Sequence, residues 1–217
     1  MPYDGDTSRG AFFPIRHGTT VASILVREAP DAAIIPYRHP RPGVSRLAEI
    51  VARADAAGAR ILAVPLGSAE HSDWAAFAKA LKEHDLLAIV AAGNEGRDIT
   101  HHPVYPTALA HENIVAVTSA DAFGRPAEGA NWGWQHVDIM LPAENLEMLD
   151  FRGTQGVASG SSYAVLRLTA FAARVLAREP DLTPGELKAR LFARAIAPPL
   201  EAEGRIAVGW IADPLAD

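Results

Sequence analysis

Three short apolar runs constrain the fold of this chain more than any other feature. They are Arg60–Leu66 (RILAVPL), Leu86–Ala92 (LLAIVAA) and Ile114–Ser119 (IVAVTS). Apolar runs of strand length without polar alternation are typical of strands that are buried on both faces of a parallel sheet. Segments with helical periodicity separate these runs, and parallel strands require such crossovers. The sequence therefore predicts an α/β fold of three layers, with a mainly parallel central sheet and helices on both faces.

The remaining elements follow from the same patterns of periodicity and of Pro and Gly. Further strands are expected at Ala32–Tyr37, Val137–Leu141 and Ile206–Trp210, and an irregular segment at Ala122–Trp134. Helices are expected from Val21 to before Pro30 and over Ser45–Ala57, Asp73–His84, Val165–Arg178 and Thr183–Ala195. A chain of 217 residues suits one domain, with an irregular segment at 1–15, a core at 16–195 and a tail at 196–217.

Composition argues against several classes of protein. The formal net charge is −6 and no stripe of Lys and Arg is present, so a nucleic-acid partner is not expected. No apolar run reaches the length of about 18 residues that a membrane-spanning helix needs. The chain has no cysteine, which excludes disulfides, thiolate metal sites and a cysteine nucleophile. The polar N-terminus lacks an apolar signal core and predicts a cytoplasmic protein, or a secreted one if the true start lies upstream.

Several chemically useful side chains fall in loops or helix starts beside these strands. In open α/β sheets ligands bind outside the carboxyl ends of the strands, and His17, Asn94 and Ser162 are expected in such places. A serine hydroxyl becomes a nucleophile when a histidine takes its proton, and an amide can stabilise the resulting oxyanion. Taken singly, Ser162 also reads as an ordinary helix cap and His17 as a capping or exposed histidine. Both interpretations remain open from these residues alone.

The motifs around these residues resemble those of a known family. His17–Ser23 (HGTTVAS) resembles HGTHVAG, Ala91–Gly96 matches AAGNEG, and Ser159–Ala164 (SGSSYA) resembles SGTSMA of the subtilisin-like serine peptidases, the subtilases of the peptidase S8 family. Weaker similarities in the same order are Pro65–Ser68, Tyr105-Pro106 with Asn113–Val117, and Asp138–Pro142. The likeness extends from residue 16 to about residue 195.

The resemblance implies a role for each matched catalytic position. His17 would act as general base and then as general acid, and Ser162 would be the nucleophile that forms an acyl-enzyme. Asn94 would donate its side-chain amide to the oxyanion, together with the backbone N–H of Ser162. The implied activity is that of a serine endopeptidase acting on peptides or proteins.

The resemblance also implies substrate-binding positions. Leu66 and Gly67 would pair with the extended backbone of the substrate, although the preceding Pro65 lacks an N–H to donate. Ala91, Ala92 and Gly93 would line the pocket for the residue before the scissile bond. No metal is expected, because the family's calcium sites use carboxylate-rich loops and no such loop is evident in the sequence. No cofactor, nucleic acid or membrane is expected either.

The catalytic aspartate is the main departure from the family pattern. The family carries it in a D-T/S-G turn at the end of an interior strand, about thirty residues before the histidine. Only sixteen residues precede His17, and the carboxylates among them are Asp4 and Asp6, neither of which follows an apolar strand. Asp6 is the candidate that the sequence offers. Three explanations stay open: a truncated chain, which is the one expected; a second chain that supplies the strand; or a degenerate subtilase with little or no activity that binds peptides or other partners.

Overall fold

Five parallel strands form the central sheet of the computed structural model, which describes residues 17–37 and 46–216. Their spatial order is β1-β2-β3-β4-β7, and every pairing between neighbours is parallel. The strands are β1 (Ile61–Val64), β2 (Leu87–Ala91), β3 (Ile114–Ala120), β4 (Ile139–Pro142) and β7 (Gly209–Trp210). Every residue of β2 and β3 is buried, as their uniformly apolar sequences require. The mainly parallel sheet expected from the sequence is confirmed.

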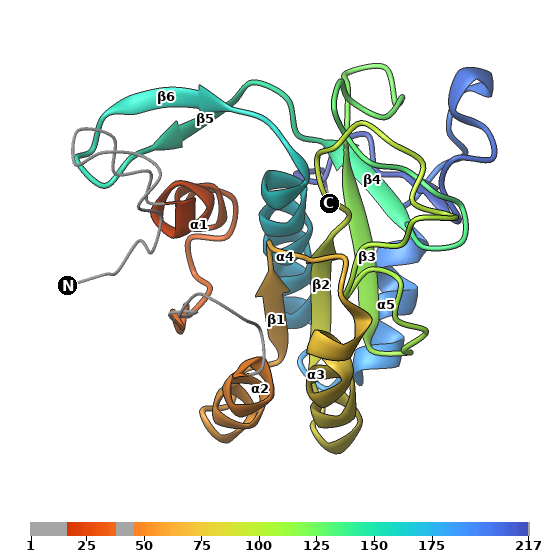
Figure 1. The fold of residues 1–217 in the computed structure, drawn as a ribbon. Coiled ribbons are helices and arrows are strands. Elements are labelled where there is room, and N and C mark those ends of the chain that lie inside the picture. Colours follow the sequence, from red (N-terminus) through yellow and green to blue (C-terminus); the bar gives the residue numbers. More distant parts are fainter. Residues whose placement is uncertain (1–16, 38–45, 217) are drawn as a thin grey trace, which may run out of the picture.

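Helices cover both faces of this sheet (Figure 1). The helices are α1 (His17–Glu28), α2 (Leu47–Ala56), α3 (His71–Glu83), α4 (Ser161–Arg178) and α5 (Pro184–Phe192). Leu87 and Ile89 of β2 belong to the core shared with α1, α4 and α5, whereas Ala88 and Val90 belong to the core shared with α2 and α3. This alternation produces three layers, as predicted. Within the described part of the chain, no helix has the length and hydropathy needed to cross a membrane.

One expected strand is wrong. Residues 33–37 are extended but belong to no sheet, and the side chains of Ile34 and Ile35 are 40% and 41% exposed. A strand is defined by backbone pairing with a neighbour, and no described strand pairs with this segment. Its apolar residues have the composition of a strand, but no strand of the described sheet pairs with them.

The sequence did not predict the antiparallel hairpin of β5 (Leu146–Leu149) and β6 (Gln155–Ala158). This hairpin lies over α1 in Figure 1 and is tied to it by two hydrogen bonds. Arg27 Nη1 donates to the carbonyl oxygen of Glu147 at 2.6 Å, and the Leu149 amide donates to Ser23 Oγ at 3.0 Å. A short 3₁₀ turn, η1 (Leu200–Ala202), precedes β7.

A buried ion pair joins α1 to α4. Arg167 Nε donates to Glu28 Oε1 at 3.0 Å and to Oε2 at 3.2 Å, and the two side chains are 9% and 3% exposed. Arg167 Nη1 also donates to the carbonyl oxygen of Pro142 at 2.7 Å. Since α1 begins with His17 and α4 with Ser161, this pair fixes the packing of the two helices that carry the catalytic candidates.

Candidate active site

The turn before α4 requires a glycine. Gly160 is the N-cap residue, with φ of +130°, a conformation that residues with a Cβ rarely adopt. A Cβ at this position would also lie 3.0 Å from Asn94 Oδ1. The cap is therefore Gly160, and Ser162 is the second residue of the helix. Its hydroxyl donates to the carbonyl oxygen of Pro65 at 3.3 Å, so Ser162 does not serve as the helix cap.

Asn94 is held beside this helix start by two hydrogen bonds between the loops. The Ser161 amide donates to Asn94 Oδ1 at 2.8 Å, and the Gly93 amide donates to Ser161 Oγ at 3.3 Å. The Asn94 side chain is exposed, and its oxygen is engaged by Ser161. An amide nitrogen on such an anchored side chain is suited to donate to a developing anion near Ser162.

His17 begins α1, close to the residue that follows Ser162. The His17 and Tyr163 rings lie 6.3 Å apart between centroids, at an interplanar angle of 62°. Thr20 links the same two residues: its hydroxyl donates to the His17 carbonyl oxygen at 2.9 Å and lies 3.4 Å from the buried Tyr163 hydroxyl. The structure thus places His17 against Tyr163 and Asn94 against Ser161, the two residues that flank Ser162.

Helices α1 and α4 begin at His17 and Ser161, so two of the candidate positions lie in the first turn of a helix. The first N–H groups of a helix have no acceptor within the helix, and the helix dipole places partial positive charge there. The Ser162 amide belongs to the first turn of α4, which begins at Ser161. Backbone N–H groups at such an end favour a bound anion. The arrangement therefore suits the stabilisation of negative charge beside the Ser162 hydroxyl.

Leu66 and Gly67 lie just past the carboxyl end of β1. Gly67 passes so close to a neighbouring loop that a Cβ there would lie 2.8 Å from the carbonyl oxygen of Tyr105. The next residue, Ser68, exchanges two backbone hydrogen bonds with Tyr105, at 2.9 and 2.8 Å. Leu66, Gly67 and His17 also line one open cavity. The extended substrate-pairing segment expected at Leu66–Gly67 therefore lies next to the catalytic candidates.

Ala91 ends β2 and Ala92 follows it; both are buried, with both carbonyl oxygens already bonded. Thr107 Oγ1 donates to the Ala91 oxygen at 2.8 Å, and Asn131 Nδ2 donates to the Ala92 oxygen at 2.9 Å. Gly93, the third predicted pocket residue, is half-buried with φ of +98°. These residues hold the Asn94 loop in place.

The sequence analysis missed Asn131. This fully buried residue accepts hydrogen bonds from the Glu95 and Arg97 amides at 3.0 and 3.2 Å, in addition to donating to the Ala92 oxygen. It thereby braces the loop that carries Asn94. Asn131 lies in a Gly- and Ala-rich irregular segment, where asparagine is a common loop residue, so no sequence signal distinguished it.

Two further predictions concern the aspartate of the site and metal binding. Asp6 lies outside the described residues. In the ranges that the structure describes, no three His, Asp or Glu side chains are grouped so that they could hold a metal ion.

Solved protease structures share this fold. A cold-adapted subtilisin-like serine proteinase is 23% identical and has a TM-score of 0.78, with 93% of this chain and 75% of that chain covered. The prenylagaramide maturation protease PagA is 23% identical with a TM-score of 0.71, covering 92% and 82% of the two chains. A lanthipeptide protease is 18% identical with a TM-score of 0.79, covering 92% and 74%.

The family is shown by the sequence as a whole. The search of curated proteins found no match to this chain. The model of the subtilase family, peptidase S8, matches residues 6–207, which is nearly the entire chain and includes all three catalytic candidates. The chain therefore belongs to the subtilase family.

Proposed function

We propose that this chain is a serine endopeptidase in which Ser162 is the nucleophile. The observation that carries the proposal is the anchoring of Asn94 to Ser161, which sets a side-chain amide beside the first turn of α4. The subtilase membership and the protease neighbours support the same reaction class. The substrates are peptides or proteins.

The chemistry assigns one role to each group. His17 takes the proton of the Ser162 hydroxyl as Ser162 Oγ attacks the carbonyl carbon of the scissile bond. The tetrahedral oxyanion accepts hydrogen bonds from Asn94 Nδ2 and from the Ser162 amide. His17 then protonates the leaving amine, and water hydrolyses the acyl-enzyme with His17 again acting as base.

Two features of the resting site bear on this reaction. The Ser162 hydroxyl donates to the Pro65 carbonyl oxygen, so it must rotate about χ1 toward His17 before attack. Leu66 and Gly67 pair with the substrate backbone, and Ala91, Ala92 and Gly93 shape the pocket before the scissile bond. In this proposal the carboxylate that orients His17 is Asp6 or an aspartate on a further strand, from this chain or from another.

The test is reaction of the protein with a fluorophosphonate probe, which forms a covalent bond with activated serines. Labelling is expected at Ser162 and is abolished by Ser162→Ala and by His17→Ala. Ser159→Ala is the matched control, because this exposed serine lies three residues away and its hydroxyl accepts from the Asn145 amide. Asn94→Ala is expected to slow peptide hydrolysis by about 10²–10³, the effect of removing the corresponding donor in subtilisin.

Absence of labelling in folded protein would overturn the enzyme proposal. The function then favoured is the non-catalytic one, a degenerate subtilase that binds peptides or other partners. The Ser162 hydrogen bond to Pro65 is the observation that favours it, because this bond points the hydroxyl at a backbone carbonyl. Peptide binding that survives Ser162→Ala unchanged, without any turnover by the wild type, would support that second function.

A further inference from the structure

Tyr163 follows Ser162 directly in α4, and its ring lies against that of His17. The two rings meet at an interplanar angle of 62°, with 6.3 Å between their centroids. Aromatic rings prefer such edge-on contacts, at centroid distances of about 4.5–7 Å. Tyr163 is buried, whereas His17 is exposed. A side chain at the surface is therefore in contact with a ring that the protein interior holds in place.

The first turn of α4 fixes the position of Tyr163. Its amide donates to the Gly160 carbonyl oxygen at 3.0 Å, and the residue is only 9% exposed. Successive residues of a helix point about 100° apart, so Ser162 and Tyr163 face different neighbours. The Ser162 hydroxyl reaches the Pro65 carbonyl oxygen, and the Tyr163 side chain reaches α1. One helical turn thus carries the candidate nucleophile and a contact to its candidate base.

A directed chain of hydrogen bonds also runs from Tyr163 to the backbone of His17. The Thr20 hydroxyl donates to the His17 carbonyl oxygen at 2.9 Å and lies 3.4 Å from the Tyr163 hydroxyl oxygen. A threonine hydroxyl has one proton, and the His17 carbonyl oxygen accepts it. The Tyr163 hydroxyl is therefore the donor to Thr20. Tyr163 acts on His17 twice, directly through its ring and through Thr20 at the backbone.

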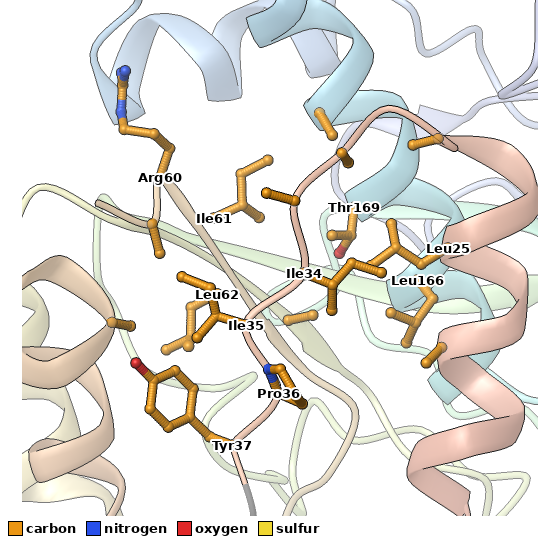
Figure 2. Close-up of a pocket in the computed structure, with 18 of the residues that line it drawn as sticks. Leu25, Ile34, Ile35, Pro36, Tyr37, Arg60, Ile61, Leu62, Leu166 and Thr169 are labelled. Carbon is orange, nitrogen blue, oxygen red and sulfur yellow. The ribbon is translucent and has the colours of Figure 1, made fainter. Parts of the chain in front are cut away.

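The contacts between α1 and α4 are polar at both ends of α1 and apolar between them. An ion pair with α4 holds Glu28, the last residue of α1. Leu25 of α1 and Leu166 of α4 belong to one apolar core and line the open cavity beside β1 (Figure 2). Apolar contacts are not directional, so they do not by themselves fix how a helix start is turned. The contact of Thr20 with Tyr163 supplies a directional link at the first turn of α1.

The orientation of His17 decides how well it can act as a base. A general base must come within about 2.6–3.2 Å of the oxygen whose proton it takes. A misplacement of about 1 Å can slow a reaction about 10²-fold. The side chain of an exposed histidine has several staggered rotamers, and most of them carry its ring nitrogens away from Ser162. An edge-on aromatic contact favours one orientation by about 2- to 12-fold.

We propose that Tyr163 is the positioning residue for His17. Its ring holds the imidazole in the orientation that reaches Ser162. Its hydroxyl, through Thr20, fixes the first turn of α1 relative to α4. In this role Tyr163 acts through His17 and not on the substrate. The role rests on the proposed function, whereas the contact between the two rings does not.

The first test follows the His17 ring by NMR in protein with isotope-labelled histidine, and His17→Gln identifies its signals. Tyr163→Leu is expected to shift and broaden the C–H signals of the His17 ring, because the shielding by the tyrosine ring is lost and the imidazole samples more rotamers. Tyr163→Phe keeps the ring and is expected to leave these signals close to their wild-type positions. This measurement requires no turnover.

The second test is the rate at which a fluorophosphonate probe labels Ser162. Tyr163→Leu is expected to lower the maximal labelling rate about tenfold, from the preference that the ring contact provides. The probe concentration that gives half of this rate is expected to change less than about twofold, since a lost orientation lowers the rate without weakening binding. Tyr163→Phe is expected to recover most of the lost rate, because it restores the ring.

Phe171→Leu is the matched control, because it removes a buried ring from the same helix. Phe171 is 3% exposed, and its ring contacts the guanidinium groups of Arg174 and Arg194, each 5.8 Å from the ring centroid. Both leucine variants are expected to lower the urea midpoint, since each removes buried aromatic surface. At a temperature where all variants are folded, Phe171→Leu is expected to keep the wild-type labelling rate and the wild-type His17 signals.

Thr20→Val tests the chain of hydroxyl groups, because valine keeps the shape of threonine without its hydroxyl. Labelling is expected to slow by about 2- to 12-fold, the range for one hydrogen bond. Thr20→Ser, which keeps the hydroxyl, is expected to recover most of that loss. Adding Tyr163→Phe to Thr20→Val is expected to change nothing further, since the Tyr163 hydroxyl acts through Thr20. Additive losses from these two substitutions would refute the chain.

Two results would overturn the proposal as a whole. One is an equal labelling rate for Tyr163→Leu and Phe171→Leu, and the other is a set of His17 signals that Tyr163→Leu leaves unmoved. Failure of the peptidase proposal gives a different result: the wild type is not labelled, while the His17 signals still respond to Tyr163→Leu. The ring contact then stands and the catalytic role of His17 falls.

Discussion

Replacing Arg167 with methionine tests how firmly the two helices of the candidate active site are joined. The Arg167 side chain is 9% exposed and that of its partner Glu28 is 3% exposed. Removing one member of a buried ion pair costs about 3–5 kcal/mol, because the other charge is left without compensation. Arg27 Nη2, 3.6 Å from Glu28 Oε1, compensates part of the charge. We therefore expect a loss of about 3 kcal/mol in the free energy of unfolding, the lower end of that range.

Urea unfolding followed by circular dichroism measures this loss as a lower midpoint at an unchanged slope. For a chain of this size the melting temperature is expected to fall by about 6–12 °C. Adding Glu28→Leu to Arg167→Met is expected to restore most of the stability, since the double variant buries no unpaired charge. Arg46→Met is the matched control: its pair with Glu49 is equally short, 3.1 Å, but the two side chains are 62% and 63% exposed. Such a pair contributes about 0–1 kcal/mol.

The reasoning would be refuted if Arg167→Met and Arg46→Met cost the same. It would also be refuted if Glu28→Leu destabilised the Arg167→Met protein further. In that case the pair would contribute through the packing of its side chains, and the argument from buried charge would fail.

Two more predictions concern the Asn94 loop and the sheet. Gly93→Ala is expected to lower the free energy of unfolding by about 1–3 kcal/mol and to slow probe labelling, because the residue has φ of +98° and a Cβ would lie 2.6 Å from Asn131 Nδ2. Gly129→Ala is the control for urea unfolding, with φ of +78° and open space around its Cβ, and an equal cost for both would contradict the contact argument. Burial raises the pKa of Asp138 above its usual 3.8, although the Ala116 amide and Lys188 oppose that shift. The folded state then holds this proton more tightly than the unfolded state, so the contribution of Asp138 to stability falls as pH rises from about 3.8 through the folded-state pKa. Asp138→Asn is therefore expected to gain stability relative to wild type across that window, measured by urea unfolding at several pH values, and parallel pH profiles would count against it.

Much of the site was predictable from local sequence. Uniformly apolar runs such as that of β2 predict buried strands because a strand covered on both faces has no wet side for polar residues. Once the strands were placed, His17, Asn94 and Ser162 followed as residues at loop or helix starts near one edge of the sheet. The motif around each residue indicated the chemistry that is proposed for it. These inferences need only the spacing of residues along the chain.

Contacts between distant segments were not predictable in the same way. Asn131 braces the Asn94 loop from more than thirty residues away, and nothing near it in the sequence indicates that contact. The choice of Gly160 as the cap of α4 also depended on the approach of Asn94. Each of these depends on which loops fold against one another, and that is a property of the tertiary structure.

The sequence by itself determined the α/β class, the order of most elements and the family motifs, because periodicity and turn residues act over a few positions. The tertiary structure decided that Ala32–Tyr37 is not a strand and that β1 is the edge of the sheet that residues 17–37 and 46–216 form. Strand formation depends on a hydrogen-bonding neighbour, and apolar composition alone cannot provide one. That is why, among the described residues, a segment with a strand-like sequence lies outside the sheet and β1 pairs with β2 alone.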